Sequence, residues 1–221
     1  MREYKRLTLL CGHYGSGKTN VAVNMAYELA ERYDAVTVAD LDIVNPYFRS
    51  KDSGEEFTRR GIRLICSEYA NSNVDIPALP PDIYAITDDR RMHAVLDIGG
   101  DDRGAYVLGR IAPAILAEGD YEMLMVINRS RPLTPDAAST VEVMREIEQA
   151  GGIPFTGLVN NTNLGSETTA EDVLASVAYA DEVAAMSGLP VVLTTVDKRL
   201  VPTLTDKISP LMGMTLQDRL Y

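Results

Sequence analysis

Cysteine is scarce in this chain, and the two cysteines present do not form a ligand pair. Cys11 and Cys66 each lie in or beside an apolar run, and the sequence contains no C-x-x-C pair. A four-thiolate iron–sulfur site would therefore need two copies of the chain to share one cluster. Cysteine in an apolar run usually behaves as a small buried hydrophobe. We expect both thiols to be reduced core residues of a cytoplasmic protein.

Long apolar stretches and runs of basic residues are also missing. No segment approaches the length of a membrane span, and the first residues, MREYKR, contain no apolar signal core. Acidic residues outnumber basic ones by 32 to 21, which gives a formal net charge of -11. A protein that neutralises nucleic-acid phosphates needs a basic face. We therefore expect neither a membrane nor a nucleic acid among the partners.

The length and composition fit one globular unit. The chain has 221 residues, of which 24% are charged, so it contains enough apolar residues for a large core and is not disordered. Neither internal repeats nor low-complexity segments are present. We expect a single domain that spans residues 1–221.

The stretch from Gly12 to Asn20, GHYGSGKTN, fits the phosphate-binding loop pattern G-x-x-x-x-G-K-[ST] at every fixed position. Glycines in such a loop let successive backbone N–H groups point at phosphate oxygens. Lys18 adds a charge for the β- and γ-phosphates, and the Thr19 hydroxyl is placed to bind Mg²⁺. An apolar run precedes the loop, and apolar residues at helical spacing follow it. The pattern predicts a nucleoside triphosphate site at a helix N-terminus.

Short apolar runs alternate with helical patterns along the rest of the chain. The runs have the length and composition of buried strands. We expect seven of them, at residues 7–11, 35–39, 62–66, 94–98, 123–127, 155–159 and 191–194, followed by a short mixed tail. Right-handed crossovers between such strands give one sheet covered on both faces. The predicted fold class is α/β, a three-layer phosphate-loop fold with a mostly parallel sheet of about seven strands.

Helix start signals occur twice in the second half of the chain. Thr134-Pro135-Asp136 is expected to start a helix that runs to about Ala150, with proline in its first turn. Thr169 or Ser166 is expected to cap the next helix.

Acidic residues follow two of the predicted strands. Asp40 and Asp42 come at the end of the second strand, and Asp97 lies near the end of the fourth, before Gly99 and Gly100. The carboxyl ends of parallel strands meet at the edge where a phosphate loop also sits. We expect Asp97 to hold the magnesium shell. The paired glycines would let a backbone N–H approach the γ-phosphate and sense its presence.

Two long polar stretches have no regular pattern. Residues 43–61 lead into a short helix, and residues 67–81 are rich in proline and asparagine. The second stretch is long for a loop in a compact domain, and such loops are often lids or binding segments, although a plain solvated loop is an equal alternative.

Four features together resemble the MinD/ParA/CobQ-like branch of SIMIBI-class phosphate-loop ATPases. They are GHYGSGKT, the DLD after the second strand, the Asp97 strand with its glycines, and a strand that ends in Asn160-Asn161. The similarity covers nearly the whole chain. DLDIVNPYFRS and GLVNNTNL are similar to uncharacterised bacterial and archaeal ATP-binding proteins of that branch. The resemblance implies ATP and Mg²⁺ as ligands more firmly than it implies a biological task.

The resemblance also assigns roles by position. Asp42 matches the acid that positions the attacking water, and Asp40 would lie beside the metal and Lys18. Asn161 matches an asparagine that hydrogen-bonds the adenine edge, for which an amide offers both a donor and an acceptor. A turn former at a strand end is the alternative for Asn161.

The predicted site residues fall into three groups. The catalytic residues are Lys18, Asp40 and Asp42, and the metal ligands are Thr19, Asp40 and Asp97. The nucleotide-binding residues are Gly12, His13, Tyr14, Gly15, Ser16, Gly17, Lys18, Thr19, Asn20, Gly99, Gly100 and Asn161.

One position departs from the pattern of the branch. Many members carry a second lysine after the first glycine of the loop, which reaches across a dimer to the partner's nucleotide, whereas this chain has His13. Histidine is shorter and largely neutral at pH 7. A homodimer therefore remains one of the predicted possibilities, but the sequence does not imply a dimer in which a lysine contacts the partner's nucleotide. Arg103, Arg129 and Arg131 are candidates for the missing cation, with solvated surface arginines as the alternative.

Three functions remain open at this point. The favoured one is a slow ATPase that acts as a nucleotide-dependent switch on a protein partner. The second is a small-molecule kinase or ligase of the dethiobiotin synthetase or cobyrinate amide-forming type, which activates a carboxylate with ATP. The third is a nucleotide-binding scaffold without turnover. The acceptor of the second would lie among Asn45, Tyr47, Arg49, Asp75 and Arg129.

Overall fold

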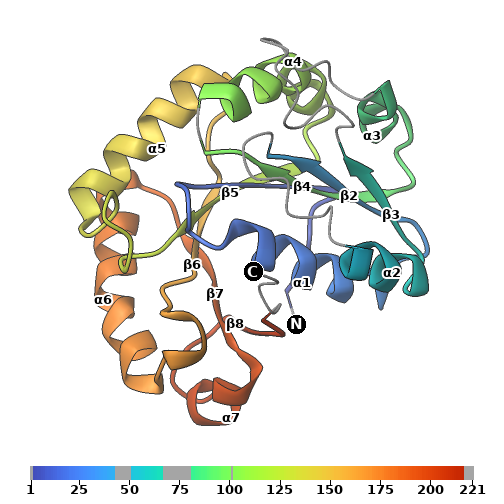
Figure 1. The fold of residues 1–221 in the computed structure, drawn as a ribbon. Helices are drawn as coiled ribbons and strands as arrows, with labels where there is room; N and C mark the ends of the chain where they lie inside the picture. The colour runs from blue at the N-terminus through green and yellow to red at the C-terminus, as the bar shows by residue number, and fades with distance from the viewer. Residues whose placement is uncertain (1, 43–50, 67–80, 101, 217–221) are drawn as a thin grey trace.

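A computed structural model describes residues 2–42, 51–66, 81–100 and 102–216 of the chain. They form an α/β fold in which one eight-stranded sheet has helices on both faces (Figure 1). Along the chain the elements are β1 (Leu7–Cys11), α1 (Lys18–Ala30), β2 (Val36–Leu41), α2 (Lys51–Arg59), β3 (Ile62–Cys66), α3 (Tyr84–Asp88), β4 (His93–Ile98), α4 (Asp102–Glu118), β5 (Tyr121–Ile127), α5 (Ala137–Gly151), β6 (Gly157–Asn160), α6 (Ala170–Ser187), β7 (Val191–Asp197), α7 (Val201–Leu204) and β8 (Leu211–Met214).

The strand order β3-β2-β4-β1-β5-β6-β7-β8 places β1 inside the sheet, between β4 and β5. Every described strand pairing is parallel. All five residues of β1 are buried, as expected for a parallel strand that is covered on both faces. The loop that follows β1 therefore leaves the carboxyl edge of the sheet with a strand end on each side of it.

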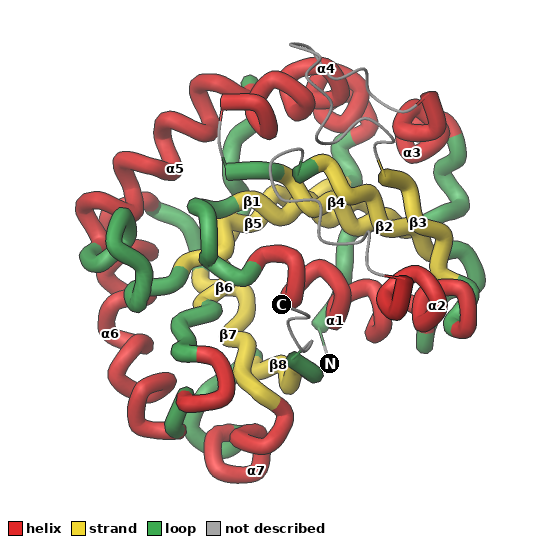
Figure 2. The backbone as a smooth tube through the Cα atoms, viewed as in Figure 1, coloured by secondary structure: helices red, strands yellow, loops and turns green. Residues whose placement is uncertain are grey.

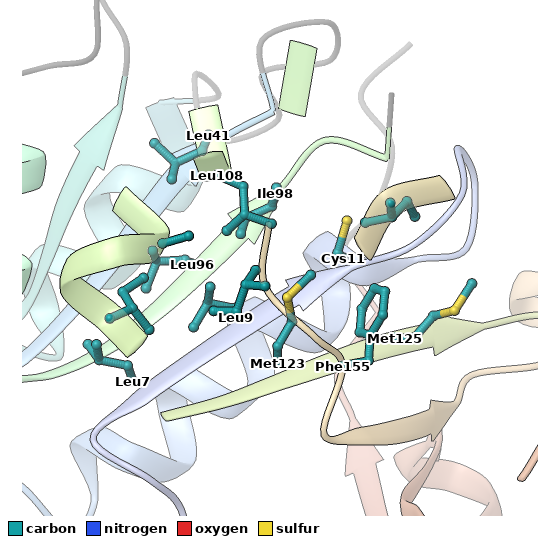
Figure 3. Packing of buried hydrophobic residues seen from close by; sticks show 14 of the residues in the cluster. Leu7, Leu9, Cys11, Leu41, Leu96, Ile98, Leu108, Met123, Met125 and Phe155 are labelled. Carbon is teal, nitrogen blue, oxygen red and sulfur yellow. The ribbon is translucent and has the colours of Figure 1, made fainter. Parts of the chain in front are cut away.

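The helices divide between the two faces because the chain moves along the sheet in both directions from β1. Right-handed crossovers toward β2 and β3 place α1 and α2 on one face, and crossovers toward β7 place α4, α5 and α6 on the other (Figure 1). The side chains of β1 alternate accordingly. Leu9 packs on the α4 side with Leu96 and Met123 from the neighbouring strands (Figure 3), and Leu10 packs on the α1 side.

The strands form an arc, and α1 lies on its inner side (Figure 2). Helix α1 is consequently buried on most of its circumference, with Val21, Met25 and Leu29 fully enclosed. The strand at one end of the arc is tied to this helix, since Asn24 Oδ1 accepts a hydrogen bond from the backbone N–H of Thr215 at 2.9 Å. On the other side, the hydroxyl of Tyr4 donates to Glu28 in this helix, so segments from both ends of the described chain hold it.

A buried arginine clamps the opposite, amino edge of the sheet. Arg6, which precedes β1, forms an ion pair with Glu118 at the end of α4. Its guanidinium also donates to the carbonyl oxygens of Ile86, Asp89 and Met92, at 2.9, 3.2 and 3.0 Å. The clamp joins β1, α4 and the segment around α3 far from the phosphate loop.

The predicted fold class is confirmed, and several details of the prediction were wrong. The sheet has an eighth strand, β8, where a mixed tail was expected. Strand β6 begins at Gly157 and not at Phe155. Helix α5 begins after its N-cap Asp136, whose side chain accepts from the Ser139 N–H, so Pro135 precedes the helix. Thr169 caps α6 through a reciprocal pair of hydrogen bonds with Asp172, as one of the two expected alternatives.

Candidate functional site

The glycine-rich loop connects β1 directly to α1, which begins at Lys18. Its N-cap, Gly17, has φ of 86°, a left-handed conformation that suits glycine. A Cβ atom at this position would also lie only 2.3 Å from Nδ2 of Asn161. No side chain caps the helix. The N–H groups of its first turn therefore remain available for an anion at the positive end of the helix dipole.

Lys18 points at the carboxylate that follows β2. Its Nζ lies 2.5 Å from Oδ2 of Asp42, and both side chains are more than 90% buried. The carboxylate of Asp40, also buried, accepts the backbone N–H of Asp42 at 3.1 Å and so fixes the DLD turn. Burial alone would lower the pKa of Lys18, but the carboxylates of Asp97 and Asp42 outweigh it and raise that pKa above the ordinary value. The lysine is a buried cation.

Thr19 points at the carboxylate in β4. Its hydroxyl donates to Oδ2 of Asp97 at 2.5 Å. Asp97 is fully buried, and burial raises the pKa of its carboxyl from 3.8 to about 6, although Lys18 and Thr19 act in the opposite direction. The other oxygen, Oδ1, is buried without a hydrogen-bond partner.

These residues fit a magnesium ion. Among the described residues, no group of three or more His, Cys, Asp or Glu side chains could hold a metal by itself. Mg²⁺ usually takes only one or two protein carboxylates and completes its shell with phosphates and water. The partnerless, buried Asp97 Oδ1 beside the Thr19 hydroxyl suits that arrangement, and Asp40 lies on the neighbouring strand, in register with Asp97.

The paired glycines after β4 touch the phosphate loop. A Cβ atom on Gly100 would lie 2.1 Å from the carbonyl oxygen of Gly12, so only glycine allows this contact. The thiol of Cys11 donates to the carbonyl oxygen of Gly99 at 3.6 Å. Burial raises the pKa of that thiol to about 12, so Cys11 is an inert core residue as expected. Gly99 and Gly100 are therefore in direct contact with the end of β1 and the start of the phosphate loop.

Asn161 is buried against the phosphate loop. Its Nδ2 donates to the carbonyl oxygen of Ser16 at 2.7 Å, and its Oδ1 accepts from the hydroxyl of Thr195 at 2.7 Å. The side chain therefore ties the loop to the ends of β6 and β7. Its predicted contact with the adenine edge stays a prediction. Thr195 was missed from the sequence because the seventh strand was expected to end at Thr194.

A small cavity opens beside Asn161, at the carboxyl ends of β6, β7 and β8. It is lined by Asn161, Thr162, Asn163, Gly165, Thr168, Val173, Thr195, Val196, Asp197, Met214 and Leu216. A larger surface hollow of about 540 Å³ lies over α3 and contains no residue of the phosphate loop. Of the two, only the small cavity adjoins the phosphate loop, because Asn161, which lines it, donates to the carbonyl oxygen of Ser16.

Several buried polar atoms around the loop lack partners. Six such side-chain atoms occur among the described residues. Four of them belong to residues on or next to the loop: Ser16 Oγ, Asp97 Oδ1, Asn128 Nδ2 and Arg131 Nε. Buried polar groups are nearly always hydrogen-bonded in folded proteins. Their concentration at one place indicates a site for a polar ligand that accepts and donates hydrogen bonds.

The remaining predicted residues are placed as follows. Nδ1 of His13 donates to the carbonyl oxygen of Tyr14 at 3.0 Å, and Tyr14 is 68% exposed. Asn20 lies in the first turn of α1, where its carbonyl oxygen accepts from Asn24. Arg129 is exposed and donates to the carbonyl oxygen of Ala175 in α6.

Other predictions fall where the structure gives no description. Asn45, Tyr47, Arg49 and Asp75, proposed for a small-molecule acceptor, lie outside the described residues, as does the side chain of Arg103. Among the described residues, no helix is both long and apolar enough to span a membrane.

Known structures share this fold. No family model matches the sequence, and no curated protein matches it. The chloroplast FtsY of Physcomitrella patens superposes with a TM-score of 0.56 at 15% identity, covering 88% of this chain and 59% of that chain. FtsY from Elizabethkingia anophelis in complex with GDP gives 0.53 at 13%, covering 89% and 58%. FlhF complexed with GTP and Mg²⁺ gives 0.51 at 15%, covering 86% and 64%.

The likeness shows the fold of SIMIBI-class phosphate-loop nucleotide-binding proteins. It does not single out the MinD/ParA/CobQ-like branch within that class. The chain spans about three fifths of the length of these solved chains.

Proposed function

We propose that this chain is a Mg²⁺-dependent ATP-binding protein of the MinD/ParA/CobQ-like branch, a slow ATPase that switches the affinity for a protein partner. One observation carries the proposal. Lys18 and Thr19 of the phosphate loop meet Asp42 and Asp97 from two neighbouring strand ends, and Asp97 keeps a buried oxygen without a partner.

The Lys18–Asp42 pair suggests how binding prepares the reaction. A triphosphate competes with Asp42 for the Lys18 ammonium, because the phosphate and the carboxylate are both anions and would occupy the same space around Nζ of Lys18. Release from Lys18 leaves the Asp42 carboxylate to accept a hydrogen bond from water and orient it toward the γ-phosphate. Thr19, Asp97 and Asp40 would hold Mg²⁺, which neutralises charge on the β- and γ-phosphate oxygens.

The lining of the cavity beside Asn161 supports adenine over guanine. Guanine recognition needs an acceptor pair for its N1–H and amino group, usually a carboxylate. Asp197 is the acidic residue among those that line the cavity, and its two oxygens accept hydrogen bonds from the N–H and Nε of Arg199. Asn163 occupies the place of the acid in an N-K-x-D box counted from Asn160, and its amide bonds the local backbone. The GDP and GTP ligands of the solved structures belong to those proteins.

The contact between Gly100 and Gly12 supports a switch. A γ-phosphate that reorders the loop would displace the segment leading into α4, and a partner that binds there would sense the nucleotide. A homodimer is one form that such a partner could take.

Binding and turnover test the proposal directly. Calorimetry should show Mg-ATP binding that Lys18→Ala weakens by about 1 kcal/mol or more, the usual size of a lost charge-assisted contact. Lys207→Ala, which removes an exposed lysine, should match the parent. Unchanged affinity of Lys18→Ala for Mg-ATP would refute the assignment of the nucleotide to the phosphate loop.

Base preference is tested by competition between ATP and GTP. The parent should prefer ATP, and Asn161→Ala should narrow the preference if the amide reads the base. Tighter binding of GTP would refute the adenine assignment while leaving the phosphate site intact.

A further inference from the structure

Arg131 lies against the phosphate loop from the side of β5. A Cβ atom placed on Gly15 would be 3.3 Å from Nε, 3.5 Å from Cδ and 3.7 Å from Cζ of Arg131. The guanidinium therefore packs on the turn of the loop, and a side chain at residue 15 would crowd it. Lys18 reaches the site from α1, so the two cations come from different elements.

The segment that carries Arg131 is held in place by backbone hydrogen bonds. The N–H of Arg131 donates to the carbonyl oxygen of Asn128 at 3.2 Å, and its own carbonyl oxygen accepts from Thr134 at 3.2 Å. The N–H of Arg129 donates to the hydroxyl of Thr162 at 3.2 Å, which joins the segment to the loop after β6. These hydrogen bonds fix the position of the backbone that carries Arg131.

The guanidinium itself has no acceptor. Nε of Arg131 is buried without a hydrogen-bond partner, and among the described residues no carboxylate forms an ion pair with this side chain. A desolvated guanidinium N–H that lacks an acceptor is costly. Arg129, two residues earlier, differs because it donates to a carbonyl oxygen of α6. Arg131 is therefore a cation that lies against the loop and has no partner among the residues that the structure describes.

We propose that Arg131 binds the terminal phosphate oxygens of the nucleotide and acts, within one chain, as the second cation of the site. The proposal rests on the proposed function, because it needs a triphosphate in the loop. The planar guanidinium pairs well with phosphate oxygens and stays charged at any working pH. His13, which stands where many relatives carry a lysine, offers no such permanent charge. The second cation then requires no partner subunit.

Paired titrations of Mg-ATP and Mg-ADP test this assignment. Arg131→Gln should weaken Mg-ATP binding roughly tenfold or more and Mg-ADP binding by less than about threefold, because only ATP carries the terminal phosphate. Arg131→Lys should recover part of the loss, since it keeps the charge without the fork. Arg145→Gln is the matched control, because it removes an exposed arginine on α5 that pairs with Glu148. It should bind both nucleotides as the parent does.

Three results would overturn the assignment. Equal losses in Arg131→Gln and Arg145→Gln would indicate only a general effect of net charge. Equal losses for ATP and ADP would place Arg131 away from the terminal phosphate. A parent chain that binds neither nucleotide would refute the proposed function itself, which separates that failure from the first two. The melting temperature of Arg131→Gln without nucleotide should be no lower than that of the parent, because among the described residues the side chain makes no hydrogen bond that the substitution would remove.

Discussion

The carboxylate of Asp42 has two competing uses. It binds Lys18 in the structure, and the proposed reaction needs it to orient water. Asp42→Asn keeps the size of the side chain and removes the negative charge. We expect this variant to bind Mg-ATP within a few-fold of the parent, since Lys18 loses a competitor for phosphate. Hydrolysis should fall by roughly 10²-fold or more, the scale of losing a positioned general base.

Asp40→Asn provides the contrast. Because Asp40 lies beside the expected magnesium ligands, this variant should lose metal-dependent binding and turnover together. Parallel calorimetry and phosphate-release assays separate the two effects. If Asp40→Asn lost turnover alone and Asp42→Asn lost binding, the two roles would be reversed.

The buried carboxyl of Asp97 predicts a pH dependence of stability. Its pKa of about 6 in the folded protein exceeds the ordinary 3.8, so protonation favours the folded state. The stability it contributes is complete below about pH 4 and is lost as the pH rises through 6. Asp97→Asn, whose amide oxygen can still accept from Thr19, avoids this loss. In EDTA, it should be more stable than the parent at pH 7, on the order of 2–3 kcal/mol.

Urea unfolding of the two proteins from pH 4 to pH 8 measures that difference. The difference in the free energy of unfolding between Asp97→Asn and the parent should grow between pH 4 and 6 and remain constant above pH 6. Other titrating groups are common to both proteins and cancel. A difference in unfolding free energy that is already complete at pH 4, or that disappears toward pH 8, would contradict the raised pKa of Asp97.

At the scale of elements, the contact between the loop and the segment before α4 can be broken by one methyl group. Gly100→Ala puts a carbon where the Gly12 carbonyl oxygen lies, so the two segments must separate. We expect hydrolysis to fall at least about tenfold and the melting temperature to drop by several degrees. Gly54→Ala in α2, where an added Cβ meets no atom within 4 Å, is the control and should match the parent. Equal effects in both variants would refute the coupling.

The elements differ in how well the sequence predicts them. The loop, β1 and α1 follow from a local pattern, and the carboxylates of Asp42 and Asp97 from the rule that parallel strands end at one edge. β8 has only four residues, one of them Gly213, and lacks a local strand signal. The Asn161–Thr195 bond and the contact of Arg131 with Gly15 depend on which strands become neighbours and on how residues 128–134 turn. Neither depends on a local pattern.

For the whole molecule, bound nucleotide should appear as added stability. A ligand at 100 times its Kd contributes about 2.7 kcal/mol, which for a chain of this size raises the melting temperature by about 5–10 °C. Differential scanning fluorimetry with Mg-ATP should show this shift in the parent. EDTA should reduce it, and Lys18→Ala should reduce it by about 2–4 °C or more, the equivalent of the expected loss of about 1 kcal/mol in binding. A parent that melts at the same temperature with and without Mg-ATP would contradict nucleotide binding.

The ion pair between Arg6 and Glu118 fixes the C-terminal end of α4. This helix runs for roughly 25 Å from the glycines at the phosphate loop to Glu118, which Arg6 holds at the amino edge. Pro113 lies between these ends and has no N–H to donate to the carbonyl oxygen of Gly109, so the helix bends most easily there. We therefore expect a displacement of Gly100 to rotate the first turns of α4 about Pro113, while the last turn, which Arg6 holds, stays in place. Under the proposed function, a partner that senses the nucleotide would then bind the part of α4 that precedes Pro113.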